Sequence, residues 1–224
     1  MTEREIFEIE NTRPHVVILG AGATIATIPN GDKNGNPCSV MHGFIHNLGL
    51  DTILATVKLN TKSENIEDIY SELYERGDEC KAVREQLEEA IFSYLSRLEL
   101  PAEITVYDEI ILALTQKDMI ATFNWDPLLI QAYNRARKLT TNLPKLTFLH
   151  GNVAAGYCER CGHFGALQRV KCDNCGAAYH RSPLLFPVKH KDYNSNPFIK
   201  QQWTILNEFL SRAKMLTIFG YSAP

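Results

Sequence analysis

The chain has 224 residues, of which 45% are hydrophobic and 22% are charged. These proportions are ordinary for a globular protein and exclude a collagen-like or intrinsically disordered chain. The formal net charge of −3 gives no overall positive field for nucleic acid or an anionic membrane. No apolar run reaches the roughly 20 residues of a membrane-spanning helix, and the acidic N-terminus does not resemble a secretion signal. We therefore expect a cytoplasmic protein with no membrane or nucleic-acid partner.

The first predicted element is a short strand. Residues 1–14 are polar and read as a lead-in, whereas the β-branched run 16–19 predicts a buried strand of a parallel sheet. Glycines directly after a strand permit a tight turn and let backbone N–H groups approach a phosphate. The third glycine of the dinucleotide-binding pattern is Ile25 here, so a phosphate loop and a plain turn both stay open. The residues of this loop are Gly20, Ala21, Gly22, Ala23 and Thr24.

The next part of the chain is predicted to be a loop and then helices. Residues 29–37 consist of Pro, Asn, Gly, Asp and Lys, which is turn chemistry. Residues 65–114 carry apolar side chains at spacings of three and four, which predicts helices, with a break at Pro101. Tyr107 belongs to the apolar stripe of the second helix. The charged stretch 75–89 is interpreted as a solvated helix face.

Strands and helices then alternate along the rest of the chain. Strands are predicted at 119–123, 146–149 and 215–219, and helices near 127–139 and 198–213. This alternation is typical of an α/β fold with a parallel sheet, in which ligands bind beyond the carboxyl ends of the strands. Polar or glycine-containing segments follow each strand, so we expect them to meet at one cleft. The candidate chemical groups are Asn124, Asp126 and His150, although each alone is more often a hydrogen-bonded structural residue.

Four of the six cysteines form two CxxC pairs. Cys158, Cys161, Cys172 and Cys175 match tetrahedral zinc, with Gly162 and Gly176 following each pair. Four thiolates leave no open coordination position, so the sequence predicts a structural zinc ribbon at 156–180. Free thiols or a redox pair are the alternatives.

Taken in order, these motifs resemble the Sir2 (sirtuin) family. They are the 20–24 loop, Thr122-Phe-Asn124-Trp-Asp126, His150-Gly151, the CxxC pairs and Gly220-Tyr-Ser222. The chain is most similar to bacterial SIR2-like domain proteins, in its 29–35 loop and its 219–224 ending. The resemblance implies a Rossmann-like sheet with a small zinc-ribbon and helical module. It divides the chain into a core of 1–155 and 181–224, a helical insert at about 38–115, and the ribbon.

The resemblance also implies NAD as the ligand and a role for each motif. The 20–24 loop would hold the phosphates, and Asn124 would position the nicotinamide ribose or an attacking water. Asp126 would lie near the nicotinamide carboxamide, His150 would act as a base, and Trp125 would line the NAD site. Gly220 and Ser222 would contact phosphate or ribose.

Several departures from protein-deacylating sirtuins affect the expected reaction. The acidic-aromatic-arginine segment after the first loop is absent, and Phe123 replaces the glutamine before Asn124. The peptide-pairing segment after the zinc module is replaced by residues 182–189. We therefore expect an NAD glycohydrolase that forms nicotinamide and ADP-ribose, with a role in bacterial antiphage defence implied by the resemblance.

Two alternatives remain open on the sequence. One is an NAD-dependent protein deacylase or ADP-ribosyltransferase, and the other is a non-catalytic module that binds NAD or ADP-ribose. A sirtuin has further structure beyond the point that Pro224 corresponds to. We therefore expect a homo-oligomer, a C-terminal domain or a partner to complete the fold.

Overall fold

The computed structural model describes residues 2–38, 43–167, 171–186 and 196–221. Its centre is a parallel sheet with the strand order β3-β2-β1-β7. The α/β fold with a parallel sheet is therefore confirmed. The four strands are β1 (His15–Leu19), β2 (Met119–Thr122), β3 (Lys145–Phe148) and β7 (Met215–Phe219).

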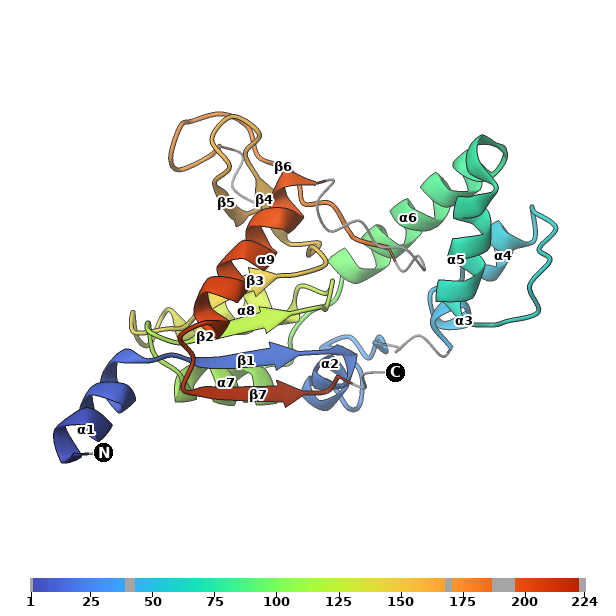
Figure 1. The fold of residues 1–224 in the computed structure, drawn as a ribbon. Coiled ribbons are helices and arrows are strands. Elements are labelled where there is room, and N and C mark those ends of the chain that lie inside the picture. Colours follow the sequence, from blue (N-terminus) through green and yellow to red (C-terminus); the bar gives the residue numbers. More distant parts are fainter. Residues whose placement is uncertain (1, 39–42, 168–170, 187–195, 222–224) are drawn as a thin grey trace.

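Helices cover both faces of this sheet (Figure 1). Neighbouring strand residues point to opposite faces, so β1 contributes to two separate cores. Val17 and Leu19 pack in the larger core, whereas Val16 packs with Leu206 and Phe209 in the smaller one. The larger core includes α2 (Ala21–Thr27), α7 (Val106–Ala113) and α8 (Leu128–Ala136), and the smaller includes α9 (Pro197–Leu210).

Strand β7 lies at one edge of the sheet and pairs with β1, from His15 opposite Met215 to Leu19 opposite Phe219. Three of its apolar side chains are about half exposed: Met215 at 52%, Leu216 at 49% and Ile218 at 56%. The described residues thus leave both faces of β7 largely open.

A group of helices lies beside the sheet (Figure 1). The sequence predicts its longer members, but not the two short helices α3 and α4. An Asx-type loop joins this group to the sheet region, because the Asp32 carboxylate accepts hydrogen bonds from the backbone of Asn34, Asn36 and Glu99. The group consists of α3 (Phe44–Asn47), α4 (Asp51–Leu54), α5 (Ile66–Glu75), a 3-10 turn (Gly77–Cys80) and α6 (Lys81–Ser96).

A second, antiparallel sheet has the order β5-β4-β6 and carries the CxxC pairs. Its strands are β4 (Ala155–Tyr157), β5 (Phe164–Ala166) and β6 (His180–Arg181). Arg181 of β6 reaches α6, where its guanidinium lies 4.1 Å from the ring centroid of Phe92 and 3.0 Å from Glu89. This contact ties the small sheet to the helical group.

The lead-in expected at residues 1–14 contains a helix, α1 (Glu3–Thr12). Thr2 and Glu5 cap its first turn reciprocally, since the Glu5 backbone N–H donates to Thr2 Oγ1 and the Thr2 N–H to Glu5 Oε2. The polar composition concealed this start signal. Within the described ranges, no helix has the length and apolar composition needed to cross a bilayer.

Candidate functional site

The candidate site begins where two neighbouring strands end. Leu19 of β1 and Thr122 of β2 are paired in register, so the chain segments that follow them emerge side by side. Asn124 therefore meets the first glycine loop, and its amide Nδ2 donates to the Gly20 carbonyl at 2.8 Å. The fold thus joins two motifs that are 104 positions apart in sequence.

Four polar side chains extend this contact into the protein, and we call them the buried polar cluster: Thr24, Tyr107, Asn124 and Asp126. Asn124 Nδ2 lies 2.8 Å from Thr24 Oγ1 and 3.2 Å from the Tyr107 hydroxyl. The Tyr107 and Thr24 hydroxyls are 2.9 Å apart, and Thr24 donates to Asp126 Oδ2 at 2.7 Å. Tyr107 comes from α7 and is fully buried.

The Asp126 carboxyl is buried and has both oxygens engaged. Oδ2 accepts from Thr24, and Oδ1 accepts from the backbone N–H of Leu128 at the start of α8. Burial raises the pKa of Asp126, although these hydrogen bonds oppose the rise. The side chain therefore braces the loop after β2, and the expected contact with nicotinamide stays a prediction.

Asn152 holds the same loop from the other side. Its Nδ2 donates to the backbone carbonyl of Asp126 at 2.6 Å, and the next residue, Val153, donates its N–H to the Trp125 carbonyl at 2.8 Å. Asn152 is completely buried. Sequence analysis missed it, although it follows His150-Gly151 directly.

His150 follows β3 and lies at the same edge of the sheet. Its ring meets Phe123, the residue before Asn124, edge to face at a centroid distance of 4.8 Å. The next residue, Gly151, has a φ of 82°, and an added Cβ would lie 1.8 Å from the Pro183 carbonyl oxygen. Only glycine fits there, which fixes the turn that carries His150. The histidine's role as a base stays a prediction.

The glycine loop packs closely against the end of β7. The Gly20 N–H donates to the Phe219 carbonyl at 3.0 Å, and the Gly22 N–H donates to the Gly220 carbonyl at 2.8 Å. Gly220 has a φ of 67°, and an added Cβ would lie 2.0 Å from the Ala23 nitrogen. Ala21 begins α2, while Ala23 and Thr24 are buried within it. The phosphate contacts expected of this loop stay predictions, and Ser222 lies outside the described residues.

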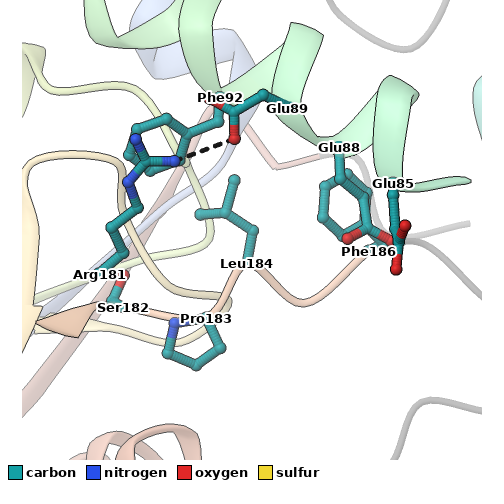
Figure 2. A pocket seen from close by; sticks show the side chains of 9 residues that line it. All are labelled: Glu85, Glu88, Glu89, Phe92, Arg181, Ser182, Pro183, Leu184 and Phe186. Carbon is teal, nitrogen blue, oxygen red and sulfur yellow. Dashed lines mark hydrogen bonds and ion pairs between the residues drawn. The ribbon is translucent and has the colours of Figure 1, made fainter.

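Trp125 connects the site to the helical group through a chain of aromatic contacts. Its ring contacts Phe186 at 5.0 Å, and Phe186 stacks on Tyr70 of α5 at 4.9 Å. Phe186 also lines a cavity of about 440 Å³ between α6 and residues 181–186 (Figure 2). Glu85, Glu88 and Glu89 line its α6 side. The stretch interpreted as a solvated face thus contributes three carboxylates to a cavity wall.

The four cysteines of the CxxC pairs meet as the spacing predicts. Their Sγ atoms all lie within 4.8 Å of one another, with 3.4 Å between Cys158 and Cys175 and 3.5 Å between Cys161 and Cys172. Tetrahedral zinc with Zn–S bonds of about 2.3 Å places its sulfurs at similar separations. The donor set therefore fits zinc and supports the ribbon.

Comparison with known proteins gives a likeness to Sir2 structures. Neither a protein-family model nor a curated protein matches the sequence. A solved structure titled "Sir2 bound to acetylated peptide" is 19% identical, covering 97% of this chain and 75% of that chain with a TM-score of 0.42. A "Sir2-p53 peptide-NAD+" structure is 18% identical, covering 97% and 75% with a TM-score of 0.39. A Sir2 homologue in an ADP-ribose complex is 13% identical, covering 100% and 76% with a TM-score of 0.39. These matches assign no residue a role.

Proposed function

We propose that the chain is an NAD-consuming domain that hydrolyses NAD to nicotinamide and ADP-ribose. The observation that carries the proposal is the placement of Asn124 against the Gly20 carbonyl at the carboxyl ends of β1 and β2, with His150, just after β3, in ring contact with the neighbouring Phe123. In open α/β sheets this edge is where ligands bind. The choice of NAD as the ligand rests on the order of the sequence motifs, which resembles that of the Sir2 family.

The proposed reaction breaks the bond between the ribose C1′ and the nicotinamide nitrogen. The bonding electron pair leaves with nicotinamide, and positive charge develops on the ribose. The Asn124 amide dipole stabilises this charge, because a fixed dipole needs no reorganisation when the charge appears. Water then adds to C1′ and His150 takes its proton, so the products are nicotinamide, ADP-ribose and one proton.

Two buried side chains would support this chemistry by holding the loop that carries Asn124. Asp126 holds Thr24 and the start of α8, and Asn152 holds the backbone of the loop after β2. In this proposal both residues keep Asn124 in place. A zinc ion held by the four cysteines would stabilise the small sheet and would supply no reactive group.

The test is to incubate the purified protein with NAD, with and without an acetyl-lysine peptide, and to identify the products by mass spectrometry. We expect nicotinamide and ADP-ribose without peptide, formed far more slowly by His150→Ala and by Asn124→Ala than by the wild type. The matched control is His46→Ala, since His46 lies on α3 and is exposed. If O-acetyl-ADP-ribose forms, and only with peptide, the protein is a deacylase and the hydrolase proposal is wrong. If the protein binds NAD but forms no product, it is a binding module and not an enzyme.

A further inference from the structure

Tyr107 contributes a fully buried hydroxyl that sequence analysis placed only in an apolar helix stripe. Its helix, α7, begins with a capping box between Thr105 and Asp108, which fixes the first turn and so the direction of Tyr107. Arg135 of α8 pairs with the same Asp108 carboxylate. The tyrosine is thus held on a braced turn, facing the loop after β2.

The hydrogen atoms of the buried polar cluster can be assigned one by one. Thr24 has one hydroxyl hydrogen, and it goes to the Asp126 carboxylate at 2.7 Å. The 2.9 Å contact between Tyr107 and Thr24 must then be donated by Tyr107. The Tyr107 oxygen is left to accept from Asn124 Nδ2 at 3.2 Å.

The same assignment decides which way the Asn124 amide faces. The Gly20 carbonyl is an acceptor only, so the amide nitrogen must point to it. The second amide hydrogen lies between Thr24 Oγ1 and the Tyr107 oxygen. Both hydrogens are directed into the protein, which leaves Oδ1 as the atom through which Asn124 meets a substrate.

We infer that Tyr107 is a positioning residue, whose hydroxyl locks the Asn124 amide with Nδ2 inward and Oδ1 toward the substrate. The kinetic consequence rests on the proposed function, whereas the orientation of the amide does not. Burial raises the pKa of Tyr107, so its hydroxyl keeps its proton and remains a donor to Thr24 at neutral pH.

The kinetic test compares Tyr107→Phe with Tyr133→Phe, a half-buried tyrosine on α8 outside the cluster. We expect Tyr107→Phe to lower kcat for NAD by about 10- to 100-fold, the cost of a small misplacement of a reacting group. KM should change by less than about twofold, because Tyr107 does not touch NAD. Tyr133→Phe should keep the wild-type kcat.

A double variant separates positioning from a general structural role. If Tyr107 acts through Asn124, then Tyr107→Phe should cause no further loss in an Asn124→Ala background. An equal fold-loss in both backgrounds, or a wild-type kcat for Tyr107→Phe, would overturn the inference.

A readout without NAD keeps this inference distinct from the proposed function. In NMR spectra we expect the Asn124 side-chain amide hydrogens to exchange slowly with solvent in the wild type and faster in Tyr107→Phe. Unchanged exchange and chemical shifts would overturn the positioning role even if the enzyme turns over NAD. A wild-type protein that leaves NAD intact would overturn the proposed function, and the exchange comparison would still decide the role of Tyr107.

Discussion

The Thr24 hydroxyl donates to the Asp126 carboxylate at 2.7 Å, joining α2 to the loop after β2 across 102 positions of sequence. Both residues are buried, with exposed fractions of 1% and 4%. A hydroxyl that both accepts from Tyr107 and donates to Asp126 links three elements of the fold at one atom.

Replacing Thr24 by valine removes this atom at almost constant volume. The buried Asp126 oxygen then loses its donor, and we expect the free energy of unfolding to fall by about 1–3 kcal/mol. Urea unfolding measures this loss. Thr204→Val on the exposed face of α9 is the control and should cost less than about 0.5 kcal/mol. Equal costs would show that the Thr24 hydroxyl stabilises nothing.

Gly220→Ala tests the close packing of the glycine loop against the end of β7. Gly77 is a matched control, because it has a similar φ of 61° but nothing within 4 Å of an added Cβ. Gly77→Ala should cost only the backbone strain, about 1–2 kcal/mol. Gly220→Ala must also move backbone, so its loss in thermal stability should be clearly larger. A smaller loss would mean that β7 can shift away from the loop freely.

The Asp118 carboxylate makes the stability of the folded protein sensitive to acid. Burial alone raises the pKa of Asp118, but hydrogen bonds from the His15 and Thr115 N–H groups outweigh it and hold the pKa below its usual value. A carboxyl whose pKa is lower in the folded than in the unfolded protein stabilises the folded state at pH values above its unfolded pKa of 3.8. This stability is lost as the pH falls through the folded-state pKa.

Unfolding measured as a function of pH checks this dependence. Asp118→Asn should flatten the loss of stability below about pH 4, where the unfolded carboxyl takes up its proton. A wild-type slope in Asp118→Asn would refute the assignment.

Metal analysis tests the cysteine cluster. We expect one zinc ion per chain, and a lower thermal midpoint after chelation because structural zinc contributes folding energy. Cys158→Ser should lose the metal, whereas Cys38→Ser, outside the cluster, should retain it. Purified wild-type protein without zinc would contradict the ribbon.

Sequence pattern predicted the parallel sheet well because buried strands and the polar segments after them follow local rules. The clustering of the four CxxC cysteines was equally predictable, because the spacing within each pair is a local signal. Tyr107 was not recognised, since a helix stripe shows which residues are buried but not where a hydroxyl points. Asn152 was missed for the same reason, because its partners are backbone carbonyls of a distant loop.

Other differences have physical causes of their own. Helix α1 was missed because its polar residues carry no core-facing stripe, although Thr2 and Glu5 supply the capping signal. Helices α3 and α4 span only four residues each, too short for a periodic pattern to appear. The tertiary partners of Glu88 and Glu89 on α6, Tyr70 and Arg181, come from distant parts of the sequence and leave no local pattern.

Of the two tryptophans of the chain, Trp125 belongs to the loop that carries Asn124, and Trp203 of α9 lies near that loop. Trp125 rests on Phe186, while the Trp203 ring lies 6.0 Å from that of Phe123 and its indole N–H donates to the Leu149 carbonyl. Tryptophan fluorescence therefore comes entirely from this neighbourhood. The tryptophan emission of the unlabelled protein is a built-in optical probe for any ligand that binds beside Asn124 or shifts this loop.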